Sequence, residues 1–374
     1  MVNKLKNLVG GLGFVGLVVG ADVTKAEYAL NMTQGVTPIS HDIYDLHMLI
    51  FWICVAIGIV VFGAMIYSIV NHRKSKNAIA ASFHESTTVE IIWTVIPFVI
   101  LVFMAIPATK TLLALEDTRD AAMTIKVTGY QWKWKYDYLD EDISFFSSLS
   151  TGRDEIANKT AKGEHYLLEV DNPVVVPINK KIRFLMTSND VIHSWWVPAL
   201  AVKQDAIPGY INDSWAEIKT PGVYRGQCAE LCGKDHGFMP VVVIAKTEAE
   251  YQEWVVAQKA QKAVEADMSG KVWTQDELMA QGEKTYNTAC AACHQPTGLG
   301  IPGVFPAIAG SAIAKGEVTG HIHIVMNGKT GTAMQAFGAQ LSDADIAAVI
   351  TYERNAFGNG MGDVIQPSDI KAAR

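Results

Sequence analysis

The segment that decides how this chain is interpreted reads Gln227-Cys228-Ala229-Glu230-Leu231-Cys232-Gly233-Lys234-Asp235-His236-Gly237-Phe238-Met239-Pro240. It gathers two thiols, an imidazole and a thioether, and its glycines and proline predict a loop rather than a helix face. Soft sulfur ligands together with histidine favour copper over harder metal ions. An upstream imidazole, His193 in the stretch 191–198, is a candidate second histidine ligand. The segment therefore predicts a copper site.

Two other interpretations of this loop remain open from spacing alone. Zinc is one, because Cys228, Cys232 and His236 could supply three of its ligands. A structural disulfide is the other, because an exported domain lies in an oxidising compartment. Met239 favours copper, since a thioether is a poor ligand for zinc.

The residues around the loop predict an all-β domain over 120–246. Short strand-like runs separated by turn residues occur in this part of the chain: Met123–Thr128, Tyr166–Val170, Lys181–Thr187 and Pro240–Ala245. Several such runs at short spacing are typical of a sandwich or barrel.

A second motif, Cys290-Ala291-Ala292-Cys293-His294, has the C-x-x-C-H spacing of covalent c-type haem attachment. Cys290 and Cys293 would bond the haem, and His294 would ligate the iron. A redox disulfide and a zinc site are the alternatives for so short a motif.

The second axial ligand of such a haem must come from further along the chain. The candidates are Met326, Met334, His321 and His323. We favour Met334, which stands in a loop before the last predicted helix, 342–356. Met326 falls in a helix-like run and is more simply a core residue. A thioether ligand raises the reduction potential of a haem.

Capping-box patterns divide the C-terminal half of the chain. Thr247 with Glu250 begins a helical linker over 247–273, and Thr274 with Glu277 begins an all-α domain over 274–374. The linker is rich in alanine, lysine and glutamate.

Two apolar stretches predict a transmembrane hairpin over 40–116. Residues 46–70 contain no acidic or basic residue other than His47, and 91–115 contain only Lys110; each is long enough to cross a ~30 Å hydrocarbon core. The positive charges of 72–76 place the connecting loop in the cytoplasm. Both termini then lie on the outer side of the membrane.

The N-terminus resembles a secretory signal peptide over residues 1–21. Two lysines precede a short, glycine-rich apolar run, and cleavage is expected after Ala21 or after Ala26. A membrane anchor is the alternative, but the run is short for a span.

Composition excludes several classes of protein. The formal net charge is −7, whereas nucleic-acid binders carry a basic excess. Five cysteines are too few for a disulfide scaffold, and Cys54, inside the first span, is expected to be a small apolar side chain.

Residues 40–246 resemble subunit II of the haem–copper cytochrome c oxidases, and 274–357 resemble a class I cytochrome c domain. The first resemblance is carried by these segments: Glu90–Pro97, Gly129–Trp134, His193–Trp195, Asp205–Gly209 and Cys228–Pro240. It implies a two-helix transmembrane hairpin, then an all-β cupredoxin-like domain, then an all-α cytochrome c domain.

The resemblance also implies cofactors and roles for particular residues. The ligands of a binuclear copper centre, CuA, would be His193, Cys228, the Glu230 carbonyl, Cys232, His236 and Met239. The Glu230 carboxylate would reach a magnesium ion at the interface with subunit I. Trp132 corresponds to the aromatic residue through which electrons enter, although a tryptophan there also packs a sheet. Glu90 corresponds to an acid at the mouth of a proton channel, although a carboxylate is also favoured near a helix N-terminus.

The implied function is the electron-input subunit of a proton-pumping terminal oxidase in a bacterial inner membrane. Electrons would pass from an external c-type cytochrome or similar donor, through haem c and CuA, to subunit I, where O2 is reduced; subunit III is a further expected partner. A site that reduces O2 is rich in histidine ligands, but His47 is the only histidine in the two spans, so that site must lie in another subunit. A CuA-bearing nitric oxide reductase and a stand-alone membrane-anchored carrier are the alternatives, and the intact copper ligands exclude a quinol oxidase subunit.

Two departures from the family patterns are notable. Position 335 is glutamine, where many class I cytochromes have proline after the axial methionine. Lys133 and Lys135 lie among aromatic residues where the family often has no lysine.

Overall fold

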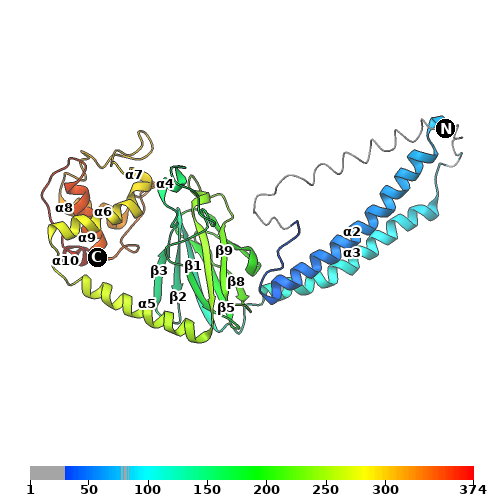
Figure 1. The fold of residues 1–374 in the computed structure, drawn as a ribbon, viewed down its shortest axis with the longest axis horizontal. Coiled ribbons are helices and arrows are strands. Elements are labelled where there is room, and N and C mark those ends of the chain that lie inside the picture. Colours follow the sequence, from blue (N-terminus) through cyan, green and yellow to red (C-terminus); the bar gives the residue numbers. More distant parts are fainter. Residues whose placement is uncertain (1–29, 77–78, 80–81, 83) are drawn as a thin grey trace. The chain divides into compact units, whose positions relative to one another are not determined.

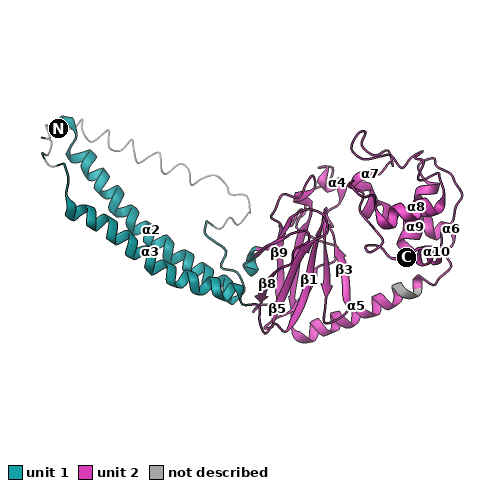
Figure 2. Cartoon of the chain, turned by 180° about the vertical axis from the view of Figure 1, so that it is seen from behind, with its two compact units in different colours: residues 1–117, 198–202 teal, residues 118–197, 203–374 magenta. Residues whose placement is uncertain are grey.

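The computed structural model describes residues 30–374 except 77–78, 80–81 and 83. The predicted signal peptide, 1–21, lies outside these described residues. The chain forms two compact units, one of residues 1–117 with 198–202 and the other of residues 118–197 with 203–374 (Figure 2).

The first unit is dominated by two long apolar helices, α2 (Pro38–Asn71) and α3 (Thr87–Glu116), which lie side by side (Figure 1). Their most apolar windows have mean hydropathies of 2.8 and 2.5, with none of those residues buried. Apolar side chains exposed along so much of a helix require a lipid environment. The predicted spans, 46–70 and 91–115, lie within these helices, and the chain is a membrane protein.

The start of α2 is fixed by hydrogen bonds within the same unit. Thr37 and Ser40 form a reciprocal capping box, and both side chains are buried. Thr37 Oγ1 also donates to the carbonyl oxygen of Leu200, at 3.1 Å, and Val36 N donates to Ala199 O, at 2.9 Å. Both acceptors belong to a short helical turn, η2 (Pro198–Leu200). The cap therefore ties the membrane hairpin to a segment far along the chain.

The second unit begins with a sandwich of two five-stranded sheets, as predicted for 120–246. In the first sheet the order is β3 (Ile143–Ser147), β2 (Lys133–Tyr138), β1 (Met123–Tyr130), β5 (Lys181–Ser188) and β8 (Asn212–Glu217). In the second it is β4 (Val174–Pro177), β10 (Pro240–Lys246), β9 (Gly222–Cys228), β6 (His193–Val197) and β7 (Val202–Ala206). β1 pairs parallel with β5, and β4 pairs parallel with β10.

Large aromatic side chains fill the space between the sheets, and their polar tips have partners. Tyr138 OH donates to Val175 O, and Trp195 Nε1 donates to Tyr136 OH at 3.1 Å. A buried hydroxyl or indole N–H without a partner is costly, so these bonds make large aromatics tolerable in the core. The resulting rigid sandwich supports the loops at its edge.

One predicted strand is wrong. Residues 166 and 167 lie in a turn, 168 and 169 have no regular structure, and Val170 makes only an isolated bridge to Leu149. Leu167 has a φ of 62°, and Leu168 N donates to His165 O, so the backbone turns instead of extending. The apolar residues that suggested a strand are only half-buried.

The segment after the sandwich is the helix α5 (Glu248–Met268), begun by hydrogen bonds between Thr247 and Glu250. It runs along the sandwich toward the last domain (Figure 1). Trp254 packs against Tyr138 and Phe145 at ring-centroid distances of 5.1 and 6.3 Å. Lys259 forms an ion pair with Glu141. Helix α5 is therefore a packed element, not a free tether.

The last part of the chain is helical, as predicted. Its elements are α6 (Gln275–Thr285), the π-helical turn η4 (Tyr286–Cys290), α7 (Ala291–His294), α8 (Val318–Asn327), α9 (Asp343–Asn355) and α10 (Pro367–Ala373). Helices α6 and α9 cross at Gly282, where a Cβ atom would overlap Ala348 O and crowd Tyr352. Residues of both helices belong to the buried cluster against which Cys290 packs.

Candidate copper and haem sites

The predicted copper loop, residues 228–239, connects β9 to β10, and strand pairing brings its ends together. Gln227 pairs with Pro240, and Cys228 N donates to Met239 O at 3.3 Å. β6 lies on the other side of β9, with Trp195 opposite Cys228. This pairing places His193, at the start of β6, beside the loop.

Five side chains and one carbonyl converge there. Cys228 Sγ lies 3.8 Å from Cys232 Sγ, 3.9 Å from His193 Nδ1 and 3.4 Å from Glu230 O. Cys232 Sγ lies 3.5 Å from His236 Nδ1 and 3.5 Å from Met239 Sδ. The structure therefore brings together all the predicted copper ligands, and His193, Cys228 and Cys232 are all buried.

The electrostatics of the two thiols fit a cation between them. Their mutual contact lowers the pKa of Cys228 to about 3 and raises the pKa of Cys232 far above its ordinary value. Two adjacent buried thiolates repel each other, so the second ionises readily only beside a cation. The 3.8 Å between the sulfurs is far longer than a disulfide bond of ~2.05 Å, so this structure does not contain the alternative disulfide.

His193 is held in one orientation by its surroundings. Its Nε2 donates to Asp190 Oδ1 at 2.9 Å, which leaves the Nδ1 lone pair directed toward Cys228 Sγ. Trp134 packs against the imidazole edge to face, with 5.8 Å between ring centroids. Gly129 provides the space, because a Cβ atom there would lie 2.7 Å from His193 Cδ2. The ring is thus oriented for a metal before one binds.

Trp132 and Gln131 contact the copper loop directly. Trp132 Nε1 and Gln131 Nε2 both donate to the carbonyl oxygen of Cys232, at 3.2 and 2.8 Å. Both side chains fit because the next residue is Gly233, with a φ of 117° and no Cβ atom. Trp132 is therefore hydrogen-bonded to the backbone of a predicted copper ligand.

The two acidic residues with predicted roles lie on the surface. Glu230 has an exposed carboxylate, although its carbonyl oxygen accepts from Cys228. Glu90 lies in the first turn of α3 and is also exposed. Glu90 belongs to the first unit, and the copper loop belongs to the second.

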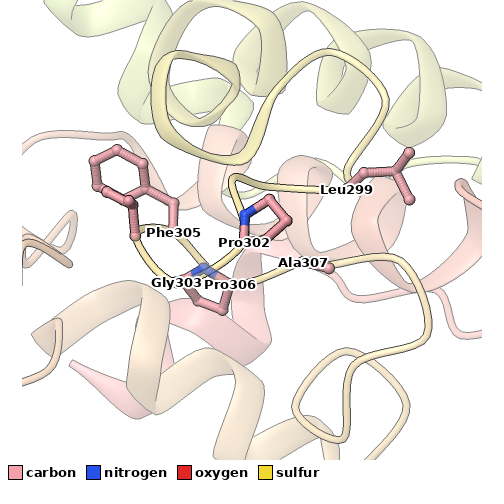
Figure 3. Close-up of a pocket in the computed structure, with 7 residues that line it drawn as sticks. Leu299, Pro302, Gly303, Phe305, Pro306 and Ala307 are labelled. Carbon is pink, nitrogen blue, oxygen red and sulfur yellow. The ribbon is translucent and has the colours of Figure 1, made fainter.

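The haem motif occupies the end of a broken helix. The π-helical turn η4 carries Cys290, and the short helix α7 carries Cys293 and His294. His294 Nδ1 donates to Pro306 O at 2.8 Å, which leaves the Nε2 lone pair available for a metal. Pro306 also borders an open hollow of about 450 Å³ lined by Leu299, Pro302, Gly303, Val304, Phe305, Pro306 and Ala307 (Figure 3).

The four candidate axial ligands differ in their burial and in their hydrogen bonds. Met326 is 7 % exposed within the helical core, and His321 is buried with its Nε2 bonded to Glu353 Oε2 at 2.8 Å. His323 is exposed. Met334 is half-buried and packs at the edge of the core. Its loop is closed by the bond from Lys329 N to Met334 O, at 3.0 Å.

Sequence reasoning missed three positioning groups: Asp190, the Gln131 side chain and the Pro306 carbonyl. Asp190 stands three residues before His193, a spacing that could have indicated a partner. The other two depend on contacts between distant parts of the chain, and neither residue type carries a signal of that role.

The fold and both donor sets are those of a membrane-bound electron-transfer protein. Residues 123–246 match the family model described as cytochrome c oxidase subunit II, periplasmic domain, and 25–111 match its transmembrane domain. Residues 277–352 match the model described as cytochrome c oxidase, cbb3-type, subunit III.

Curated proteins and a solved structure are similar to parts of this chain. The probable cytochrome c oxidase subunit 2 of Rickettsia bellii (strain RML369-C) is 38% identical over 259 residues, which is 68% of this chain and 93% of the relative. Cytochrome c oxidase subunit 2 of Arabidopsis thaliana is 40% identical over 241 residues, 64% of this chain and 93% of the relative. The crystal structure of the periplasmic domain of subunit II from Bradyrhizobium japonicum is 42% identical, covers 38% of this chain and 98% of its own, and has a TM-score of 0.35.

The chain belongs to the cytochrome c oxidase subunit II family and carries a C-terminal cytochrome c domain. It is accordingly a subunit of a haem–copper oxidase. Membership implies copper in the β domain and haem in the helical domain, and the donor groups present fit both.

Proposed function

We propose that this chain receives electrons from an external c-type cytochrome or similar donor at its cytochrome domain. It passes them through its copper domain to subunit I of a proton-pumping oxidase, where O2 is reduced to water. The observation that carries the proposal is the gathering of two thiols, two imidazoles and a thioether in one loop and strand end, with neighbouring sulfur contacts of 3.4–3.9 Å.

The copper ligands proposed are His193, Cys228, the Glu230 carbonyl, Cys232, His236 and Met239. When bound, a two-copper centre supplies a one-electron store shared between the metals. The chain contributes orientation: Asp190 fixes the His193 ring, and the β9–β10 pairing fixes the loop. A site that is held rigid in this way reorganises little when its charge changes.

The haem ligands proposed are covalent Cys290 and Cys293 and axial His294 and Met334. A haem with histidine and methionine ligands supplies a one-electron site of raised potential. The Pro306 carbonyl holds the His294 ring by its Nδ1 proton. His321 is already paired with Glu353, which supports Met334 over the histidine.

Three further roles are proposed. Trp132 is the aromatic through which electrons reach the copper loop, supported by its bond to Cys232 O. The Glu230 carboxylate binds magnesium at the interface with subunit I, supported by its exposure. Glu90 takes part in proton uptake, supported by its position in the first turn of a membrane helix.

The proposed location is a bacterial inner membrane, with both termini on the periplasmic side and subunits I and III as partners. The basic residues Arg73, Lys74 and Lys76 between the two helices support this orientation.

Rapid mixing of the purified oxidase with reduced donor tests the order of transfer. Haem c absorbance should change before the CuA absorbance does. Deleting residues 274–374 should cut turnover with the donor while the copper domain still accepts electrons from a small-molecule reductant. Reduction of CuA before haem c would contradict the proposed order.

A further inference from the structure

The cytochrome domain, residues 274–374, contacts the copper domain, residues 120–246, next to Trp132. Gln335 Nε2 donates to the carbonyl oxygen of Gln131 at 2.6 Å. Gln335 directly follows Met334, the proposed axial ligand, and Gln131 Nε2 donates to Cys232 O at 2.8 Å. Two hydrogen bonds and the intervening covalent bonds therefore connect the Met334 loop to a copper-binding cysteine.

The residue on the other side of Trp132 also contacts the cytochrome domain. Lys133 Nζ lies 4.8 Å from the ring centroid of Phe146, on β3, and 5.5 Å from that of Phe337. Phe337 stands two residues after Gln335 and is 8% exposed. A cation between two aromatic faces is attracted to both, so Lys133 joins the two domains.

A third contact lies away from the first two. Arg153 Nη2, on α4 (Arg153–Ile156), donates to the carbonyl oxygen of Asn287 at 3.4 Å. Asn287 belongs to η4, the turn that leads to Cys290. Contacts at both the Met334 loop and the haem-attachment turn favour one orientation of the domain.

Gln335 and Lys133 are two of the three positions at which the sequence departs from the family patterns, and both take part in the contact between the two domains. A proline at 335 would have no side-chain N–H to donate to Gln131. The departures are thus matched to a cytochrome domain that belongs to the same chain.

We propose that the chain's own cytochrome domain docks over Trp132 through Gln335, Phe337, Lys133 and Gln131, and that Gln335 is a positioning residue for haem-to-copper electron transfer. This inference rests on the proposed function. Its consequence is that a soluble donor delivers electrons to the cytochrome domain, because the surface around Trp132 is covered by part of the same chain.

The test uses the intact purified oxidase with two substitutions. Gln335→Leu removes the side-chain N–H that bonds to Gln131 O, and Lys133→Leu removes the cation between the two aromatic rings. Gln275→Leu, at an exposed amide of α6, is the matched control. Acetylation by a soluble reagent measures how often Lys133 is uncovered. Lys135 is the internal reference, because it pairs with Asp137 inside the copper domain. Photoreduction of haem c then measures the rate of transfer to copper.

Losing one hydrogen bond should shift docking about fivefold. Gln335→Leu should raise acetylation of Lys133 relative to Lys135 by about that factor, because the undocked fraction grows. It should also slow haem-to-copper transfer, with haem and copper spectra unchanged. Lys133→Leu should slow transfer similarly, and Gln275→Leu should change neither measurement.

Different experimental results would overturn the docking inference and the proposed function. Rapid transfer in the unaltered protein, with no change of labelling or rate in Gln335→Leu, overturns the docking inference and leaves the function standing. Increased labelling without slower transfer overturns the positioning role of Gln335. Absence of haem-to-copper transfer in the fully loaded, unaltered protein overturns the proposed function, and the labelling result still tests docking.

Discussion

Asp190 and His193 form a hydrogen-bonded pair at the buried edge of the copper loop, with 2.9 Å between Asp190 Oδ1 and His193 Nε2. Asp190 also accepts from the backbone N–H of Gln131 through its other oxygen, at 2.8 Å. One carboxylate therefore fixes both the imidazole and the turn between β1 and β2 that carries Trp132.

Replacing this carboxylate should weaken copper binding without removing a ligand. Asp190→Ala frees the His193 ring to rotate, and loss of such a partner typically lowers metal affinity 10–100-fold. Competition titration with a copper chelator measures the change. Asp137→Ala, at an acid that pairs with Lys135 elsewhere on the copper domain, is the control. Equal affinities in the two variants would contradict the orienting role of Asp190.

Removing one thiol should abolish the copper signal and spare the haem. Cys228→Ser removes a sulfur that contacts three other predicted ligand groups, His193 Nδ1, Glu230 O and Cys232 Sγ. The Cys290–His294 motif lies in another domain. Electron paramagnetic resonance should lose the mixed-valence copper signal, and haem absorbance should stay normal. Cys54→Ser, at an exposed cysteine of α2, should change neither. A normal copper signal in Cys228→Ser would refute the assignment of this thiol.

The two methionines of the cytochrome domain should respond differently to truncation. Met334→Ala should remove the sulfur-to-iron charge-transfer band and lower the haem potential. Met326→Ala should keep the band but destabilise the domain by about 2–5 kcal/mol, because it leaves a cavity in the core. Absorbance spectra and thermal unfolding separate the two effects. If the band vanishes only in Met326→Ala, the wrong methionine has been assigned.

Stability should increase with pH because of Lys133. Burial lowers its pKa from 10.5 to about 8, although the nearby carboxylates of Asp171 and Asp190 act in the opposite direction. Between these two values the unfolded chain binds more protons at this position than the folded chain, so folding becomes more favourable as pH rises. Below pH 8 the lysine is charged in both states, so the folded chain bears the full free-energy cost of burying that charge.

The difference in unfolding temperature between the unaltered protein and Lys133→Met measures this effect. The difference should shift in favour of the unaltered protein as pH rises from about 8 to about 10.5. Using a difference cancels the titration of other groups. A difference that does not vary with pH would show that Lys133 is not buried in solution.

Local sequence signals predicted most of the architecture. The spans follow from uncharged apolar length, and both capping boxes form as predicted at Thr247 and Thr274. The wrong strand at 166–170 has a local cause: apolar content there suggested extension, but Leu167 adopts a left-handed conformation within a turn. Apolar composition does not by itself report backbone direction.

The composition of the copper site was predictable, whereas its supporting contacts were not. Thiols, imidazoles and a thioether at short spacing are rare enough in sequence to indicate a metal. The bond from Gln335 to Gln131 joins residues on different domains, and glutamine is common in many roles. Such contacts depend on how the domains pack, which local patterns do not contain.

The packing of α5 against the sandwich makes the helical phase of this segment matter. Each residue of an α-helix advances ~1.5 Å and turns ~100°. Because Trp254 and Lys259 fix the first half of α5, one residue inserted after them would rotate everything downstream by about that angle. The Gln335 side chain would then face away from Gln131. We therefore expect a change in the length of α5 to disturb electron transfer between the domains more than substitutions at its exposed positions do.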